Sequence, residues 1–491
     1  MSRYTFNPKL DPNRDRNRRI LIGAIAFGVV IVLGIALLIF GITQLTGSAN
    51  NAPATDATTA PTMEIGVTIF APVVTPQDGA APAETAQPSG DAGAQAGNEQ
   101  PAATPVPMDP RGKVAGIDDF SCKNARPAPA AFGYGIQSNW SVGDIGYWNS
   151  VMAEQLKVNW TRAKVNWYEY EPEKGKQNAG QFQLLDAFVG DANQKGLNIV
   201  LTITQPPQWT RVTQPKKAGD RPSPPEDVNE GIRFFNLITA RYKGCVQAIE
   251  VLNEPNLDRE WVVASGELKA ADYVDFLKAV TPGMREIDPT LLIVMAAPSP
   301  TGANIPGGVQ DDFAYLEDFV KAGGADLVDC IGVHLNGYNM PPNVRYNEGF
   351  NNPKAKFRGP FDNPNHSWSF LSTIEGYRER TNKPMCVTEF GWASIENLTR
   401  KDGTPVTTAP PGFDFALDNT EKNQAEWIVM SYNMLREMGY VRFASVFNLD
   451  FIQKIGESPD EPRGDPALYS VIRQNGAPRP AFEAIRDMPK P

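Results

Sequence analysis

The sequence predicts an α/β protein: an eight-stranded (β/α)8 TIM barrel preceded by a transmembrane helix and a disordered linker. Three observations lead to this fold class. Residues 20–42 are apolar and uncharged, residues 43–112 are rich in Ala, Pro, Thr, Gln and Gly, and from residue 113 short apolar runs alternate with longer amphipathic stretches. Alternating strands and helices are typical of a parallel sheet with right-handed crossovers.

The first 42 residues have the features of a membrane anchor. Residues 1–19 form a basic tail, and the apolar run that follows is 23 residues long. At about 1.5 Å per residue, a helix of that length crosses a hydrocarbon core of roughly 30 Å. Because basic flanks stay inside, we expect a single-pass protein of the cell membrane with its tail in the cytoplasm and its folded domain outside. A cleaved secretory signal is the alternative; its apolar stretch is usually shorter, about 7–15 residues, but the small residues at 47–49 leave cleavage open.

Residues 43–112 are predicted to be a disordered linker. Positions 47–110 contain seven acidic residues and no basic one, and ten prolines lie between 47 and 112. Such a segment cannot bury enough apolar surface to offset the entropy lost on ordering it. The apolar patch at 63–74 is either a strand that docks elsewhere or part of the linker, and the sequence does not decide between the two.

Residues 113–491 are predicted to be the barrel, with eight βα units and some enlarged loops. An open, doubly wound sheet is the structural alternative, but no Gly-rich phosphate loop follows the first strand. The predicted strands end near Gly135, Arg162, Thr204, Asn253, Ala297, His334, Glu389 and Asn448, and helical patterns occupy 183–195, 228–242, 270–287, 313–322, 369–381 and 420–438.

The composition excludes several function classes. The net charge is -10, which argues against nucleic acid as a partner because phosphate binding needs clustered Lys and Arg. The two histidines, His334 and His366, lie far apart. No Cys/His spacing suggests zinc, and no Asp-rich loop suggests a calcium site of the EF-hand kind. We therefore expect no metal and no cofactor, and we expect a monomer.

Two glutamates follow strands where a barrel places its chemistry. Strand four ends in EVLNEPN with Glu254, and strand seven ends in CVTEFGW with Glu389. Because the carboxyl ends of all eight strands converge on one face, we expect these side chains to meet. Glycoside cleavage needs such a pair: one carboxyl group protonates the leaving oxygen, and the other attacks or activates water.

These motifs resemble those of the clan A glycoside hydrolases, in particular families 5 and 39. The resemblance rests on NEP at 253–255, TEFGW at 388–392, the strand-two sequence TRAKVNWYEYEPEKG and the closing stretch 468–485. It covers roughly residues 130–487. It implies that Glu254 is the general acid/base and Glu389 the nucleophile of a retaining reaction, with carboxyl groups about 5–5.5 Å apart.

The resemblance also assigns supporting residues. Arg162 matches the arginine beside the nucleophile, Asn253 the asparagine that binds the sugar 2-hydroxyl, and His334 the histidine that ends strand six. Three positions depart from the pattern. Asn336 stands where families 5 and 39 place a tyrosine, so that Tyr338 is the nearest candidate for that role; Gln205 replaces a histidine after strand three; and Phe447-Asn448 replaces a tryptophan on strand eight.

Further expectations concern the cleft, the titration and the cysteines. Aromatic rings stack on the apolar faces of sugars, and we assign Trp209 and Trp392 to the cleft. The general acid must hold a proton, so we expect the pKa of Glu254 to be raised by burial and by the Glu389 carboxylate.

Outside the cell disulfides are permitted; Cys122 and Cys245 are a plausible pair, whereas Cys330 and Cys386 are expected to be buried free thiols.

The function that these expectations favour is a membrane-anchored, extracytoplasmic retaining glycoside hydrolase whose partner is an oligo- or polysaccharide. Two alternatives stay open. One is a non-catalytic carbohydrate-binding or surface-interaction protein on the same barrel. The other is a transglycosylase, which would use the same residues with a sugar instead of water as acceptor.

Overall fold

The computed structural model describes residues 112–211, 224–261, 267–455 and 458–491. In these ranges eight parallel strands form one sheet in the order β5-β4-β3-β2-β1-β8-β7-β6. A parallel bridge between Val294 and Cys330 closes the remaining gap between β5 and β6, so the predicted (β/α)8 barrel is confirmed. The strands are β1 Gly133–Gln137, β2 Trp160–Asn166, β3 Asn198–Thr204, β4 Ala248–Val251, β5 Leu292–Met295, β6 Ile331–Gly337, β7 Met385–Trp392 and β8 Val441–Val446.

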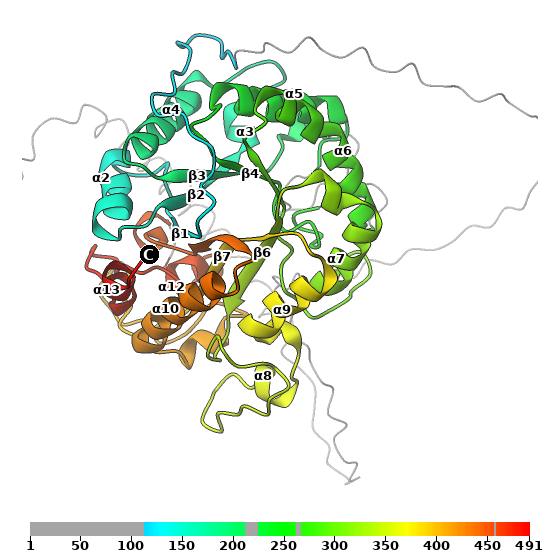
Figure 1. Cartoon of the computed structure of the whole chain (residues 1–491). Helices are drawn as coiled ribbons and strands as arrows, with labels where there is room; N and C mark the ends of the chain where they lie inside the picture. The colour runs from blue at the N-terminus through cyan, green and yellow to red at the C-terminus, as the bar shows by residue number, and fades with distance from the viewer. Residues whose placement is uncertain (1–111, 212–223, 262–266, 456–457) are drawn as a thin grey trace, which may run out of the picture. The chain divides into compact units, whose positions relative to one another are not determined.

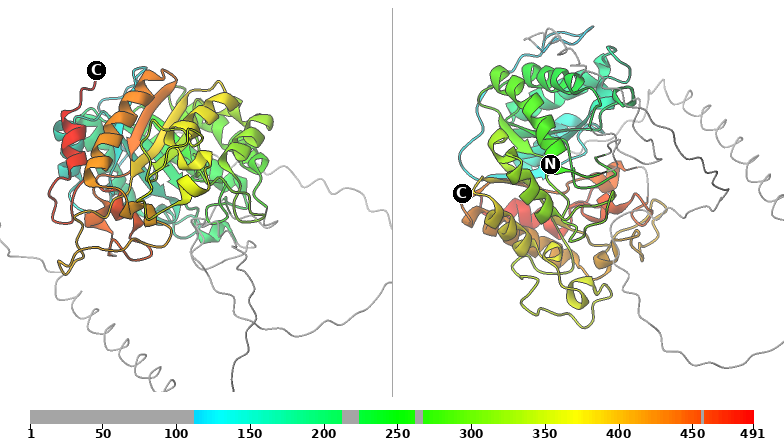
Figure 2. Two further views of the ribbon diagram at one scale, coloured as in Figure 1. Left: turned by 90° about the horizontal axis from the view of Figure 1, so that it is seen from below. Right: turned by 90° about the vertical axis from the view of Figure 1, so that its right-hand side faces the viewer.

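Helices surround the strands, and the perpendicular views show the α8 segment projecting from the edge of this ring (Figures 1 and 2). Each of the six predicted helical stretches corresponds to an observed helix. The longer helices are α2 Ile145–Ser150, which runs into a π-helical turn at Val151–Gln155, α4 Ala179–Gln194, α5 Val228–Arg241, α6 Ala270–Ile287, α7 Asp312–Lys321, α9 Phe370–Arg380, α10 Glu421–Glu437 and α13 Pro480–Asp487; the short ones are α3 Trp167–Tyr170, α8 Gly359–Asp362, α11 Phe451–Lys454 and α12 Asp465–Leu468.

A second apolar cluster, distinct from the main core, gathers residues from the beginnings of the strands. Trp160 stacks on Phe443 with ring centroids 4.6 Å apart. A Cβ on Gly133 would collide with the indole of Trp160, so only glycine fits at that position of β1. The cluster fills the end of the barrel where the strands begin. The end where the strands finish is left for polar side chains.

The same cluster contains a disulfide between Cys330 and Cys386, whose Cα atoms are 5.8 Å apart. The expectation of two free thiols is therefore wrong. Cys386 pairs in register with Gly332, close to the start of both β6 and β7. Neighbouring parallel strands place their first inward-facing residues side by side, whatever their separation along the chain, and this geometry brings the two sulfur atoms together.

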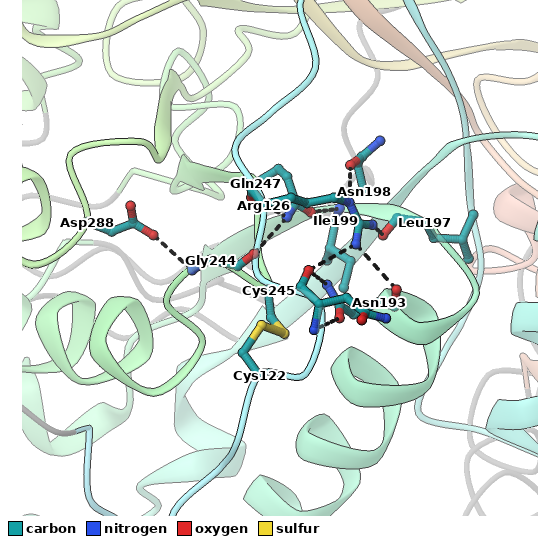
Figure 3. Close-up of a disulfide and its surroundings, with 11 residues drawn as sticks. Cys122, Arg126, Asn193, Leu197, Asn198, Ile199, Gly244, Cys245, Gln247 and Asp288 are labelled. Atoms are coloured by element: carbon teal, nitrogen blue, oxygen red, sulfur yellow. Dashed lines mark hydrogen bonds between the residues drawn. A yellow bond between two sulfur atoms is a disulfide. The ribbon is translucent and has the colours of Figure 1, made fainter.

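A second disulfide, Cys122–Cys245, fastens the segment that precedes β1 and confirms the predicted pair. Figure 3 shows Arg126 of this segment donating to the carbonyl oxygen of Leu197 and to the side chain of Asn198. Arg241, the last residue of α5, donates to the carbonyl oxygens of Gly112 and Asp118. Helices of the barrel run opposite to its strands, so this segment, residues 112–131 and called the strap below, lies at the end where the strands begin.

The predicted tail 1–19, the membrane helix 20–42 and all of the predicted linker 43–112 except Gly112 lie outside the described residues. In the ranges that the structure does describe, no helix is both long enough and apolar enough to span a bilayer.

Candidate active site

The two predicted carboxylates meet at the carboxyl ends of the strands. Glu254 follows β4, and Glu389 lies within β7. Both face the imidazole of His334 in β6: its Nδ1 is 3.0 Å from Glu254 Oε1, and its Nε2 is 3.9 Å from Glu389 Oε1. One buried ring thus touches both acids, which are 135 positions apart in the chain.

Arg162 holds Glu389 in place from β2. Its Nη1 donates to Glu389 Oε1 and, at 2.8 Å, to Gln137 Oε1, while its Nη2 donates to Asn253 Oδ1 at 3.2 Å. Burial lowers the pKa of this guanidinium, but the charges of Glu250 and Glu389 outweigh that effect and raise it. Arg162 is therefore a permanent cation beside Glu389, where the resemblance placed it.

Glu250 is a third carboxylate of the site, and sequence reasoning missed it. It is completely buried in β4. Its Oε2 accepts from Arg162 Nη2 at 2.8 Å and from Thr202 Oγ1 at 2.6 Å, and its Oε1 accepts from Thr388 Oγ1 at 2.9 Å. The available signal was an acid inside the apolar run QAIEVLN, because a buried carboxylate needs a charged partner. Glu250 orients Arg162 toward Glu389.

An irregular register in β7 directs two consecutive side chains into the barrel. Val333 pairs with Val387, but His334 pairs with Glu389, so Thr388 is an extra residue on β7. Side chains alternate along a regular strand, and a bulge resets that alternation. Thr388 consequently reaches Glu250 while Glu389 reaches Arg162.

Glu389 is held in its ionised form. Burial raises the pKa of its carboxyl group, but the charges of His334, Arg162 and Lys164 oppose burial and lower the pKa to about 2. A carboxylate that stays charged in a buried site is suited to nucleophilic attack.

The pKa of Glu254 differs from the expectation. Burial does raise it, as predicted, but the hydrogen bond and charge of His334, together with Arg259 and Lys164, more than cancel that effect and lower it well below the ordinary range. The expected increase is therefore wrong. Burial lowers the pKa of His334, and the charges of Glu389 and Glu254 raise it overall. Both shifts favour the imidazole as the holder of the proton that the pair shares.

The backbone around Glu254 is strained. Leu252 has φ 74° and Glu254 has φ 38°, which is uncommon for side chains of their size. The Glu254 amide donates to the carbonyl oxygen of Ala297 at 3.2 Å. Strain of this kind persists only where the surrounding contacts hold the backbone in that conformation. Such places are often functional sites.

The group formed by Glu254, Glu389, His334 and Arg162 is called the pit below, and the other predicted site residues do not all lie there. Asn253 lies there, with its amide oxygen fixed by Arg162. Trp209 is half-buried, and its indole donates to the Glu171 carbonyl oxygen. Tyr338 is buried among the rings of Phe357, Trp368 and Phe415.

Trp392 does not present a ring face to the cleft. It is completely enclosed, donates to the Met340 carbonyl oxygen and stacks on Phe370. The sequence placed it correctly at the end of a strand, but side chains there alternate between the pit and the surrounding helices, and Trp392 packs on the helix side. Its assignment to the cleft is wrong.

Two cations of the site were also missed. Lys164 Nζ is 3.9 Å from Glu389 Oε1, and Arg259 Nη2 is 3.2 Å from Glu254 Oε2. The signal for Lys164 was its spacing. Trp160, Arg162 and Lys164 are every second residue of β2, so all three point into the barrel, at successive heights along the strand. Arg259 lies in the loop after β4 and had no comparable signal.

One group among the described residues could hold a cation. Asp311, Asp312 and His366 place their ligand atoms within 4.8 Å of one another. The imidazole Nε2 of His366 lies 3.1 Å from Asp312 and 3.5 Å from Asp311. None of these three belongs to the pit, and the chemistry of the two glutamates does not draw on them.

A family model decides the classification. The model described as cellulase, glycosyl hydrolase family 5, matches residues 134–434. The chain belongs to glycosyl hydrolase family 5. The match spans the barrel from β1 into α10, and so the family 5 domain contains both glutamates, Arg162 and His334. It is a clan A glycoside hydrolase barrel, as the motifs indicated.

The chain also resembles several solved structures. A family 39 glycoside hydrolase from the gut symbiont Bacteroides cellulosilyticus WH2 is 17% identical with a TM-score of 0.48, over 73% of this chain and 63% of that one. The exo-beta-1,4-mannosidase Op5Man5 from Opitutaceae bacterium strain TAV5 is 15% identical with a TM-score of 0.49, over 75% and 61%. The chain thus spans less than two thirds of either protein. No curated protein matches the chain.

Proposed function

We propose that this family 5 protein is a retaining glycoside hydrolase that acts on an oligo- or polysaccharide, with Glu389 as nucleophile and Glu254 as general acid/base. One observation carries the proposal: carboxylates from β4 and β7 flank a single imidazole ring. This proximity favours the separation of about 5–5.5 Å that a retaining reaction needs over the roughly 6.5–9.5 Å of an inverting one.

In the first half of the reaction, a Glu389 carboxylate oxygen forms a bond to the anomeric carbon. The bond from that carbon to the leaving oxygen breaks, and Glu254 gives its proton to the leaving oxygen. His334, Arg162 and Lys164 supply the charges that keep Glu389 ionised until the attack. The product is a glycosyl ester on Glu389 and a free sugar alcohol.

The proton that Glu254 delivers comes from its pair with His334. The charge of Glu389 is the strongest contribution that raises the pKa of His334 against burial. Glu389 loses this charge as its ester forms, so the pKa of His334 falls. The proton then passes from Nδ1 to Glu254 Oε1 across the 3.0 Å contact and on to the leaving oxygen.

The second half reverses the proton transfer. Glu254, now a carboxylate, removes a proton from water, and the water oxygen attacks the anomeric carbon. The ester bond breaks and Glu389 regains its charge. A sugar hydroxyl in place of water would give the transglycosylase.

We further propose that residues 20–42 anchor the protein in the cell membrane with the barrel outside. The apolar run is long enough to span a bilayer, and its basic flank lies on the N-terminal side. The strap of residues 112–131 lies at the end of the barrel where the strands begin, so a chain that arrives from the linker meets the face opposite the pit.

The covalent intermediate provides the test. The full chain is incubated with 2-fluoro sugars that carry good leaving groups and represent both neutral and anionic glycans, and its intact mass is measured. We expect the mass of one glycosyl group, mapped to Glu389 by peptide analysis and absent from Glu389→Ala. Glu426→Ala, on an exposed face of α10, is the matched control and should be labelled normally. Folded protein without an adduct across the whole panel would instead indicate the non-catalytic barrel.

A further inference from the structure

Lys164 and Arg259 flank the two reacting carboxylates and remain within reach of a ligand. The side chain of Lys164 is 30% exposed and that of Arg259 is 40% exposed, whereas Arg162 is fully buried. Lys164 lies against Glu389, and Arg259 lies against Glu254. The site therefore has one accessible cation beside each carboxylate.

The site holds one more positive charge than negative. Glu250, Glu254 and Glu389 face Arg162, Lys164 and Arg259, and the His334–Glu254 pair shares one further proton. The excess is one whether that proton lies on His334 or on Glu254. It stays at one when Glu389 becomes an ester, because the proton has then left with the alcohol and Glu254 is a carboxylate. Uncompensated charge in a buried site is costly.

The environment of Arg259 adds an independent observation. Its Nε is buried and has no hydrogen-bond partner, although its Nη2 reaches Glu254. His334 Nε2 and Asn336 Oδ1 are also buried without a hydrogen-bond partner. Buried polar atoms in native proteins are nearly always paired, so these unpaired atoms indicate polar contacts that a bound substrate completes.

We propose that the substrate carries an anionic group, such as the carboxylate of a uronic acid or a sulfate ester, on a sugar at the scissile bond, and that Lys164 and Arg259 bind it. This inference rests on the proposed function and specifies its substrate class. An anionic group on the substrate compensates the single excess positive charge of the site. Charge-assisted hydrogen bonds from ammonium and guanidinium groups to carboxylate or sulfate oxygens are among the strong ones.

Lys164 and Arg259 are expected to contact different sugars of the substrate. Lys164 lies beside the nucleophile, so it faces the sugar that becomes attached to Glu389. Arg259 lies beside the acid, so it faces the leaving sugar. Each assignment can therefore be tested with a substrate that carries its anion on one side only.

The experiment compares matched aryl glycosides that differ only in a carboxylate or a sulfate ester against the neutral sugar, across several sugar configurations. We expect the full chain to have a higher kcat/KM on an anionic member, by roughly 10- to 100-fold, the factor that a charge-assisted hydrogen bond contributes. Lys164→Met should remove this preference, Lys164→Arg should retain most of it, and added salt should weaken it. The carboxylate and sulfate arms identify which anion is bound.

Arg259→Met is tested on disaccharides with the anion on the leaving sugar, where the same loss is expected. Lys278→Met removes an exposed lysine of α6 that pairs with Asp275, and it should change neither rate. Equal or better hydrolysis of the neutral members would overturn the inference and leave the glycosidase standing. A loss of equal size on neutral and anionic substrates would also overturn it, since Lys164 and Arg259 would then only tune the carboxylates. No hydrolysis and no adduct with any member would remove both proposals.

Discussion

At the scale of single residues, the chemistry of Glu254 depends on which charges face it. A buried carboxyl group is expected to hold its proton, yet His334 at 3.0 Å and Arg259 at 3.2 Å reverse that tendency. Burial could be anticipated from a strand end in an apolar run. The opposing charges could not, because they come from β6 and from a loop whose path the sequence does not specify.

Replacing Glu254 separates its two roles. In Glu254→Ala, substrates with poor leaving groups should lose about 10²- to 10⁴-fold in rate, the usual contribution of a general acid. Activated aryl glycosides should lose far less in the first step, because their leaving groups need no proton. The measurement is single-turnover kinetics on both substrate types, with Glu426→Ala as control. Equal losses on both would remove the acid role.

His334 should set the alkaline limb of the pH–rate profile. Its pKa is raised above the ordinary value, so the pair keeps its shared proton until the pH rises through that raised pKa, and activity is then lost. In His334→Asn the proton can reside only on Glu254, whose ordinary pKa is about 4.3. We therefore expect the alkaline limb of kcat/KM to move to lower pH. An unchanged limb would show that His334 takes no part in holding the proton.

At the scale of elements, helix boundaries were predictable where capping and periodicity agree. The stretch 420–438 became α10, whose N-cap Thr420 and Asn423 form a capping box, and 228–242 became α5, capped by Asp227. The helix after β1 was missed because α2 has six residues and continues as a π-helical turn. The bulge in β7 was also unpredictable, because it depends on the register with β6 rather than on the local sequence.

The two disulfides should differ in accessibility. Cys122 is partly exposed on the strap, whereas Cys330 and Cys386 are buried in the barrel interior. Under native conditions, mild reductant followed by alkylation should label Cys122 and Cys245 first, and Cys330 and Cys386 only after unfolding. Peptide mass spectrometry reads out both pairs in one sample. Early labelling of the interior pair would contradict its burial.

Removing either disulfide should also lower the free energy of unfolding, by roughly 2–5 kcal/mol. The double variants Cys122→Ala/Cys245→Ala and Cys330→Ala/Cys386→Ala can be compared directly. Chain entropy favours a greater effect for Cys122–Cys245, since its two cysteines are 123 positions apart in the sequence and those of Cys330–Cys386 are 56 apart. Packing favours a greater effect for the interior pair, since both of its sulfur atoms are buried. Denaturant unfolding of the two variants shows which contribution is larger.

At the scale of the whole molecule, charge divides the chain into segments with different predicted roles. The basic tail, the apolar run and the acidic linker precede a domain whose described residues hold the barrel and its pit. The strap and its disulfide tie the start of that domain to α5. The barrel is thus expected to be structurally independent of the segments before it.

Shortening the chain to residues 112–491 should therefore leave its melting temperature and its kcat/KM within about twofold of the full chain, while the full chain alone sediments with membranes. Leu33→Arg/Leu37→Arg in the full chain is the matched control, because each charge at the centre of a membrane helix costs roughly 2.5–3.5 kcal/mol. Release of this variant would support the anchor. A shortened chain that still sediments would contradict it.

The sequence by itself determined the barrel and the two glutamates at the ends of strands four and seven, and it offered Cys122 and Cys245 as a plausible pair. The barrel and the glutamates follow from local periodicity, from motifs and from the rule that strand ends converge. Tertiary structure alone decided the state of Glu254, the Cys330–Cys386 bond, the enclosure of Trp392 and the presence of Glu250, Lys164 and Arg259 in the site. The physical reason is distance: charge, hydrogen bonding and packing act over 3–4 Å between residues that lie far apart in the chain, and only the closed barrel sets those distances.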